Sequence, residues 1–249
     1  MIDAECISET LEALTDDATS RRYAKEHSTL RGIRGVPTGE IARLGDAVWA
    51  ESGTELPRDR QALQQLYGAA WEDGLVAIGL LATCVPDTPA EALAVGEAWL
   101  HRIDDLVSAD ALGWLVIGGA ALATQSPLPV LEPDAHLMAS RALASAAMAW
   151  IPCPIEGPSA APLRAKLGTR QIQWTDRTHP EWLAPHCTAL LRDRHPCIQK
   201  ALRRVVKAWA TASPEEVTLW ASNVPGGIPK VLRADIQRIV KKAARAKRT

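Results

Sequence analysis

The chain has 249 residues and a formal net charge of −1, with 47% hydrophobic residues, nine Trp, two Tyr and no Phe. This length allows one or two globular domains, and this hydrophobic content excludes wholesale disorder. The small net charge hides a division, because residues 1–130 carry 9 Lys/Arg against 20 Asp/Glu, whereas residues 131–249 carry 19 against 9. A chain polarised in this way can bind a polyanion with one half without being basic overall.

The longest apolar run, Ala111–Ala123, has thirteen residues, fewer than the roughly 20 that a membrane-spanning helix needs. We therefore expect a buried helix there and no contact with a membrane. The acidic N-terminus, Met1–Glu5, lacks the pattern of a signal peptide. The five Cys are odd in number and contain no CxxC pair, so disulfides are not expected. These features indicate a cytoplasmic protein.

Helix signals recur along the chain, and the alternating patterns typical of strands are nearly absent. Capping residues, or a proline in the first turn, predict where each helix begins. In chain order, the predicted helices cover residues 38–50, 57–67, 71–84, 89–99, 104–123, 135–150, 180–192 and 197–210, followed by one that begins with the capping pattern at Ser213 and a basic one that opens at Pro229.

These helices are short, come in pairs and are separated by turns that proline marks. The pattern predicts an all-α fold in which antiparallel helix pairs with degenerate repeats stack into a curved solenoid. The alternative is a compact irregular bundle. Residues 151–178 are the least regular stretch and contain four Pro, so we expect an irregular insertion there within a single domain over residues 1–249.

Two basic segments lie in the C-terminal half. Side chains at i, i+3, i+4 and i+7 share one face of a helix, and this spacing holds for four cations, Lys200, Arg203, Arg204 and Lys207. The last twenty residues contain eight Lys/Arg, Arg233 among them, against the single acid Asp235. Such a face can bind phosphates with strongly salt-dependent affinity, because counterions are released. The alternative is a solvated helix face followed by a frayed basic tail.

Asp110 directly precedes the apolar run Ala111–Ala123. A carboxylate in that place is costly unless it is paired, solvated in a channel or functional. The alternative is a helix N-cap, a position that Asp favours.

Other signals of chemistry are weak. The chain contains no GxSxG elbow and no Walker A loop. The spacing of five potential metal ligands matches no established zinc pattern; they are His179, His186, Cys187, His195 and Cys197. We therefore expect ordinary surface His and buried Cys there, and neither a metal nor another cofactor.

Five segments, taken together, resemble the HEAT-like alkylpurine DNA glycosylase family, the AlkD type. Each resembles a family motif, and all five follow the family's order over about residues 30–245. They are the turn Arg34–Thr38, the segment Leu66–Ala77 with Glu72, the segment Leu106–Asp110, the segment His136–Leu143 with Arg141, and the stretch Cys197–Val217.

The resemblance implies a C-shaped stack of HEAT-like helix pairs whose basic concave face holds duplex DNA. It implies a monofunctional glycosylase, in which water cleaves the N-glycosidic bond of a purine alkylated at N3 or N7, without a deep base pocket and so with tolerance for bulky adducts. Asp110 takes the place of the family's catalytic Asp, which stabilises the oxocarbenium-like sugar and positions water. Asp105 is the candidate if the register differs. Arg141 takes the place of the Arg that clamps a backbone phosphate.

The chain departs from the family pattern at three aromatic positions. Leu106 and Arg204 stand where the family has two Trp that face the lesion and stabilise positive charge, and Met138 stands in place of a third Trp. Three explanations compete. The enzyme could act on a different, larger or less charged adduct; Arg204 could contact phosphates or insert into the duplex while Asp110 still works; or catalysis could be lost, leaving a scaffold that only binds DNA.

The leading hypothesis is therefore a DNA glycosylase that acts as a monomer and removes alkylated purines from duplex DNA, with bulky adducts among the candidate lesions. The residues expected to bind DNA are Arg141, Lys200, Arg203, Arg204, Lys207 and Arg233, and those expected to line the substrate site are Leu106 and Met138. A second hypothesis is a non-catalytic HEAT-like protein that recognises distorted or branched DNA. A third is a protein-interaction solenoid without a nucleic-acid role.

Overall fold

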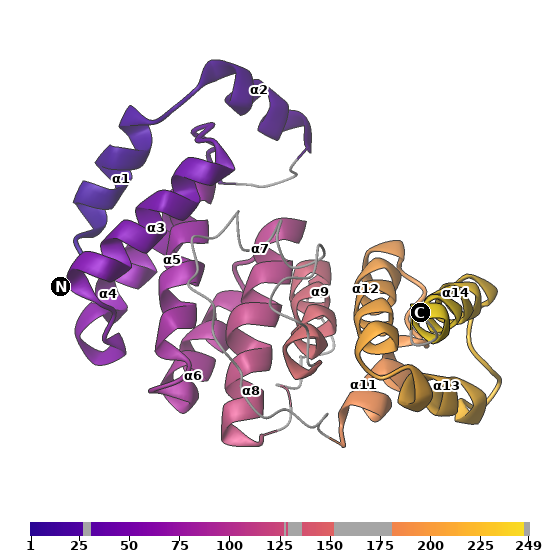
Figure 1. Ribbon diagram of the computed structural model, residues 1–249. Coiled ribbons are helices and arrows are strands. Elements are labelled where there is room, and N and C mark those ends of the chain that lie inside the picture. The colour runs from indigo at the N-terminus through magenta and orange to yellow at the C-terminus, as the bar shows by residue number, and fades with distance from the viewer. Residues whose placement is uncertain (27–30, 127, 129–135, 152–180, 247–249) are drawn as a thin grey trace.

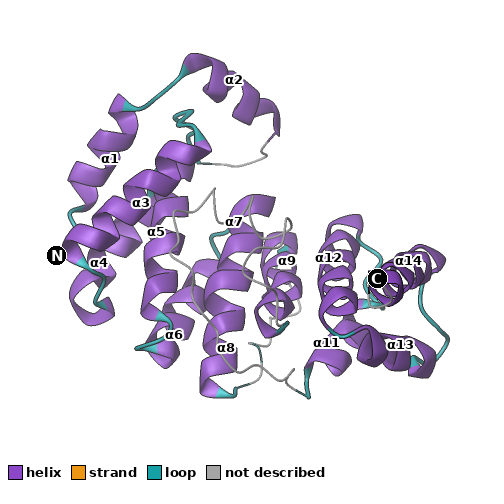
Figure 2. Ribbon diagram, in the orientation of Figure 1, coloured by secondary structure: helices purple, strands orange, loops and turns teal. Residues whose placement is uncertain are grey.

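A computed structural model of the chain describes residues 1–26, 31–126, 128, 136–151 and 181–246, and within these residues it contains helices and no strand (Figure 2). In chain order the elements are α1 (Ala4–Ala13), α2 (Asp17–Glu26), α3 (Thr38–Ser52), α4 (Leu56–Gly68), α5 (Trp71–Cys84), α6 (Pro89–Leu100), α7 (Leu106–Ala111), the π-helix η1 (Leu112–Gly118), α8 (Gly119–Thr124), α9 (Leu137–Ala146), the 3₁₀ turn η2 (Ala147–Trp150), α11 (Leu183–Leu190), α12 (Pro196–Ala212), α13 (Pro214–Asn223) and α14 (Lys230–Ala246).

The predicted all-α fold is confirmed for the described residues. Helices α3, α4 and α6 begin at, or one residue before, the positions that proline and capping residues predicted, and α5 begins at Trp71, the predicted first residue of its apolar run. The sequence reading missed α1 and α2, although Asp3 is a recognisable N-cap whose side chain accepts a hydrogen bond from the Cys6 amide. The predicted helix at 135–150 is instead α9 followed by η2. The expected insertion near residues 151–178 lies, from residue 152 onward, outside the described residues.

The helices lie side by side in chain order, from α1 and α4 at one end of the molecule to α12, α13 and α14 at the other (Figure 1). Such an order is what stacked helix pairs require. The curvature of the stack and the HEAT-like character of its repeats stay predictions.

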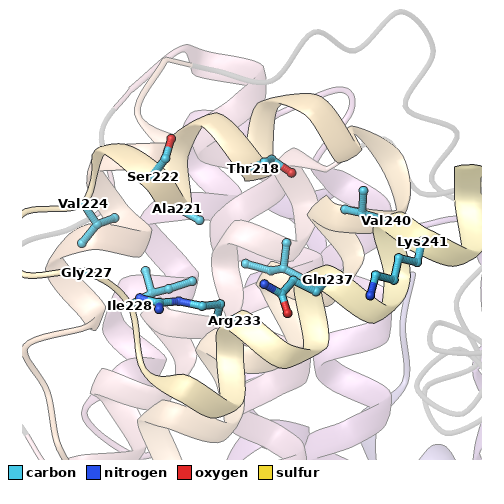
Figure 3. A pocket seen from close by; sticks show the side chains of 11 residues that line it. Thr218, Ala221, Ser222, Val224, Gly227, Ile228, Arg233, Gln237, Val240 and Lys241 are labelled. Atoms are coloured by element: carbon cyan, nitrogen blue, oxygen red, sulfur yellow. The ribbon is translucent and has the colours of Figure 1, made fainter.

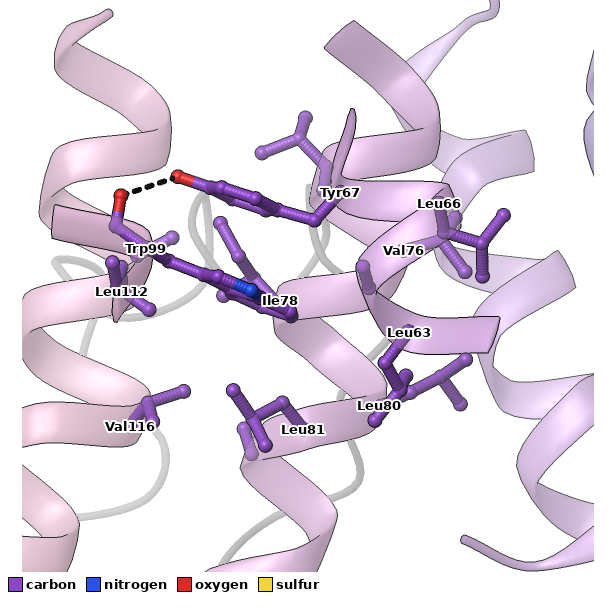
Figure 4. Close-up of a cluster of buried hydrophobic side chains, with 14 of the residues drawn as sticks. Leu63, Leu66, Tyr67, Val76, Ile78, Leu80, Leu81, Trp99, Leu112 and Val116 are labelled. Carbon is purple, nitrogen blue, oxygen red and sulfur yellow. Dashed lines mark hydrogen bonds between the residues drawn. The ribbon is translucent and has the colours of Figure 1, made fainter. Parts of the chain in front are cut away.

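The core of the N-terminal part is built around a stacked aromatic pair. The Tyr67 and Trp99 rings lie 4.0 Å apart between centroids and nearly parallel, and the Tyr67 hydroxyl donates a hydrogen bond to the Trp99 carbonyl oxygen at 3.2 Å (Figure 4). Leucine, valine and isoleucine side chains from α4, α5 and η1 surround the pair. A second core, with Trp150, Trp209 and Trp220, joins η2 to α11–α14. The many Trp therefore serve largely as core side chains.

The apolar run lies in one continuous helical segment, Leu106–Thr124, made of α7, η1 and α8. By length and composition alone this segment could cross a membrane, but 67% of its most apolar window is buried inside the protein. It is thus the buried helix that the sequence predicted.

Backbone contact joins this segment to α9. A Cβ atom at Gly113 would lie 1.9 Å from the Ala142 carbonyl oxygen, and one at Gly118 would lie 2.1 Å from the Ala146 carbonyl oxygen. Only glycine allows the two helices to come so close. Because the facing residues rise in number together, the two segments run in the same direction. The same packing brings two side chains into contact, Asp110 one turn before Gly113 and Arg141 directly before Ala142.

We expect Gly113→Ala to lower the free energy of unfolding by about 3 kcal/mol, because the added methyl group meets the rigid backbone of α9. Gly39→Ala is the matched control, since no atom lies within 4 Å of its Cβ position on the exposed side of α3. Urea unfolding should show the control as stable as the wild type or slightly more stable. Equal stability of the two variants would contradict the close contact.

Candidate functional site

Asp110 lies inside α7, in the turn that leads into η1, and is therefore not a helix N-cap. The cap of α7 is Asp105, whose Oδ1 accepts hydrogen bonds from the backbone amides of Val107 and Ser108. The other oxygen of Asp105 pairs with Arg31 at 3.1 Å. The N-cap interpretation of Asp110 was wrong because the helix begins at Leu106, five residues before the start that this interpretation requires.

Both oxygens of the Asp110 carboxylate are occupied by donors from two other helices. Arg141 of α9 donates from Nε to Oδ1 at 2.6 Å and from Nη2 to Oδ2 at 2.7 Å. The Ser145 hydroxyl, one turn further along α9, donates to Oδ1. Arg204 of α12 donates from Nη1 to Oδ2 at 2.6 Å. A carboxylate has about four acceptor positions, so this one is fully used.

The environment of Asp110 favours its charged form. Burial acts to raise the pKa of the carboxyl group, but the hydrogen bonds and charge of Arg141, together with the charge of Arg204, hold that pKa below its ordinary value. Burial likewise opposes the charge on Arg141, yet the hydrogen bonds to Asp110 leave the pKa of its guanidinium raised. The site therefore contains one carboxylate and two cations, with a net charge of +1.

The two arginines differ in exposure. The Arg141 side chain is 1% exposed, and its Nη1 donates to the Cys197 carbonyl oxygen at the start of α12. The Arg204 side chain is 37% exposed. Arg141 thus ties α7, α9 and α12 together from inside, whereas Arg204 closes the site from its solvent side.

Two apolar side chains, Leu106 and Met138, lie near the cluster of Asp110, Arg141 and Arg204. Leu106 is one turn before Asp110 on α7 and is 43% exposed. Met138 is one turn before Arg141 on α9 and is partly buried against the core. Side chains at i, i+3 and i+4 share a helix face, so both residues lie on the helix faces that carry the charge cluster.

Three more cations converge on a second carboxylate, Asp235 of α14. Arg203 Nε pairs with its Oδ2, Lys207 Nζ lies 3.5 Å from the same oxygen, and Arg238 Nη2 lies 3.0 Å from Oδ1. The hydrogen bond from Arg203 holds the pKa of Asp235 below its ordinary value. This cluster has a net charge of +2 and lies on the α12 side of α14.

The remaining predicted DNA-binding cations lie along two grooves. Lys200 lines a groove between the starts of α12 and α14, together with Arg203 and Leu232. Arg233 lines a larger groove of about 620 Å³ between α13 and α14, where Lys241 lies at the other end of an apolar floor (Figure 3). The predicted face of α12 is thus divided, with Arg204 at Asp110 and Arg203 and Lys207 at Asp235.

The potential metal ligands that the structure describes do not gather. Cys187 is buried, and the His186 ring packs edge-on against Trp150, where burial lowers its pKa to about 4. His195 instead caps α12 by accepting a hydrogen bond from the Cys197 amide. Among the residues that the structure describes, no group of three or more His, Cys, Asp or Glu side chains could hold a metal ion. His179 lies outside those residues.

The sequence reading missed two functional candidates, Ser145 and Asp235. Ser145 follows Arg141 by four residues, so helical spacing would have placed it on the same face. Asp235 was noted only as the single acid of the basic tail. Its role depends on the packing of α14 against α12, which no local pattern encodes.

The model of a family described as DNA alkylation repair enzyme matches residues 7–153. The match covers more than half of the chain and includes Asp110, Arg141 and Ser145, whereas Cys197 and Arg204 lie beyond it. The searches of curated proteins and of solved structures found no match to the chain.

We expect Asp110→Asn to lower the free energy of unfolding by about 3–5 kcal/mol, because it leaves the buried Arg141 guanidinium without a counter-charge. Urea unfolding at neutral pH measures this, and Asp87→Asn at an exposed position is the control. A change below about 1 kcal/mol would contradict the buried ion pair.

The same pair gives the stability a pH dependence. Because the folded pKa of Asp110 is lowered, its contribution is fully present above the unfolded value of about 3.9 and is lost as the pH falls through the folded value. Wild-type stability should therefore fall on acidification below about pH 4, more steeply than that of Asp110→Asn. Parallel curves for the two proteins would contradict the lowered pKa.

Proposed function

Because the chain belongs to the family of DNA alkylation repair enzymes, which supports a role in the repair of alkylated DNA, we propose that it is a DNA glycosylase. It hydrolyses the N-glycosidic bond of purines alkylated at N3 or N7 in duplex DNA. The observation that carries this proposal is Asp110, a buried carboxylate held in its ionised form where α7, α9 and α12 meet.

The chemistry needs an anion more than an acid. Alkylation at N3 or N7 makes the purine cationic, so the base leaves with the electron pair of the C1′–N bond and becomes neutral. Positive charge then develops on the sugar, and an ionised carboxylate nearby stabilises it. An oxygen of Asp110 can also accept a hydrogen bond from the water whose oxygen attacks C1′. The proton that this water loses passes to solvent.

Arg141 and Ser145 would act on Asp110. Their three hydrogen bonds to its carboxylate fix its orientation and keep it charged, which is the preorganisation that electrostatic catalysis requires. The role of Arg141 as a phosphate clamp stays a prediction, since a side chain that is 1% exposed would have to turn outward to meet a phosphate.

The rest of the proposed interface is basic. Lys200, Arg203, Lys207 and Arg233 would contact the DNA backbone, while Leu106 and Met138 would border the lesion. Such contacts give affinity without reading sequence. A monomeric state and a cytoplasmic location stay predictions, and the proposed reaction requires no cofactor.

A second candidate function has a specific observation in its favour. Arg204 occupies Asp110 Oδ2 at 2.6 Å, and Leu106 and Arg204 stand where the family resemblance would place Trp. A non-catalytic protein that binds distorted or branched duplex DNA would retain the basic surface and use Asp110 only to hold three helices together.

We expect purified protein to release 7-methylguanine from duplex DNA, and Asp110→Asn to slow single-turnover release by about 100-fold or more. The assay is run at a temperature where circular dichroism shows the variant folded, with Asp87→Asn as the control. Failure of the wild type to release 7-methylguanine, 3-methyladenine or a bulky adduct, with duplex binding intact, would favour the second candidate. Loss of duplex binding at low salt as well would favour a protein-interaction role.

Lys200→Glu should weaken duplex binding and reduce the slope of log K against log salt by about one or more, because a protein that neutralises fewer phosphates releases fewer counterions. Fluorescence anisotropy over a salt series measures both quantities. Lys25→Glu is the matched charge reversal on exposed α2 in the acidic half and should change neither. Identical salt slopes for Lys200→Glu and the wild type would show that this face of α12 does not contact the DNA.

A further inference from the structure

The state of Asp110 in the free protein is not the state that glycosylase chemistry needs. Both of its oxygens are saturated by hydrogen bonds from Arg141, Ser145 and Arg204, so none is open to water or to the sugar. Two cations around one anion also repel a cationic base. Either the site is inactive, or one of its partners leaves when DNA binds.

Exposure identifies the partner that can leave. Arg141 is buried, makes two hydrogen bonds to Asp110 and a third to the Cys197 carbonyl oxygen. Ser145 is 2% exposed. Arg204 makes a single hydrogen bond to Asp110, and its side chain is 37% exposed. A long arginine side chain with a guanidinium near the surface can turn toward solvent without disturbing the packing of α12.

The neighbours of Arg204 supply a reason for it to turn. It lies on the same α12 face as Lys207 and next to Arg203, and both of these residues belong to the Asp235 cluster of net charge +2. A DNA backbone that these cations attract would bring a phosphate close to Arg204. Arginine binds phosphate and carboxylate through the same fork of N–H donors.

We propose that Arg204 exchanges partners, leaving Asp110 Oδ2 for a backbone phosphate when duplex DNA binds, and so opens the carboxylate for reaction. The exchange breaks one Arg–carboxylate ion pair and forms one Arg–phosphate ion pair. It leaves Arg141 as the ion-pair partner of Asp110, with Ser145 still donating to Oδ1, and the net charge of the site falls from +1 to zero where positive charge must develop. The opening of Asp110 rests on the proposed function, whereas the exchange itself is a binding event that stands without it.

The exchange would also restrict the substrate to alkylated bases within a DNA strand. A free alkylated nucleoside has no backbone phosphate, so it cannot draw Arg204 away and finds Asp110 blocked. The opening of the carboxylate is thus coupled to the DNA backbone, which confines the reaction to damage within a polymer.

The test compares Arg204→Gln with the wild type and with Arg58→Gln. Arg58 forms a similar pair with buried Asp59, also at 2.6 Å, in the acidic half of the chain, so its loss controls for the removal of an Arg–Asp pair. For Arg204→Gln we expect about tenfold weaker binding to an undamaged duplex and a salt slope smaller by about one. Single-turnover base release at saturating DNA should be faster than that of the wild type, because no Arg204 ion pair has to leave Asp110 before the reaction.

A second measurement needs no base release. In the wild type, addition of undamaged duplex should shift the NMR signal of the Arg204 Nε–H group and leave that of Arg141 in place, with Arg204→Gln used to assign the former. The inference is overturned if the Arg204 signal does not move, or if Arg204→Gln keeps the wild-type salt slope and affinity. It is also overturned if release by Arg204→Gln at saturation falls to the level of Asp110→Asn. If no variant releases a base while the Arg204 signal moves, the exchange holds and the glycosylase proposal fails.

Discussion

The bidentate ion pair between Asp110 and Arg141 is the interaction on which the rest of the site depends. It joins α7 to α9, and the third donor of Arg141 reaches the Cys197 carbonyl oxygen and so adds α12. A buried charge without its partner is strongly destabilising, so neither residue can change alone. The bond to Cys197 also connects the stretch matched by the family model to the helices that follow it.

The ion pair is possible because two glycines remove side chains from the helix contact. At Gly113 and Gly118 the backbone of the long apolar segment approaches the backbone of α9 closer than any Cβ would allow. The two segments run in the same direction, which sets Asp110 opposite both Arg141 and Ser145. Packing of small residues thus determines the geometry of the charged ones, and the apolar segment serves as the support for the site.

The charges of the C-terminal half are organised by two acids. Asp110 and Asp235 each collect cations from α12, and the resulting clusters carry net charges of +1 and +2. Carboxylates that hold arginines at the surface limit the conformations of these side chains, which lowers the entropy cost of binding a phosphate. These carboxylates also compete with DNA phosphates for the same cations, because each cation must leave its carboxylate or be shared with it when a phosphate binds. Arg204 is the residue at which this competition bears on the proposed chemistry.

The sequence by itself determined the all-α class, most helix starts, the burial of the apolar segment and the polarity of charge between the two halves, because proline, capping residues and hydrophobic spacing act locally. It also singled out Asp110 and Arg141 through a family resemblance. Only the tertiary structure decided that these two residues meet, that Asp105 is the cap, that Arg204 covers Asp110, and that Arg203 and Lys207 are held by Asp235. Residues as far apart as Asp110 and Arg204 are joined by helix packing, and no local pattern records which helices become neighbours.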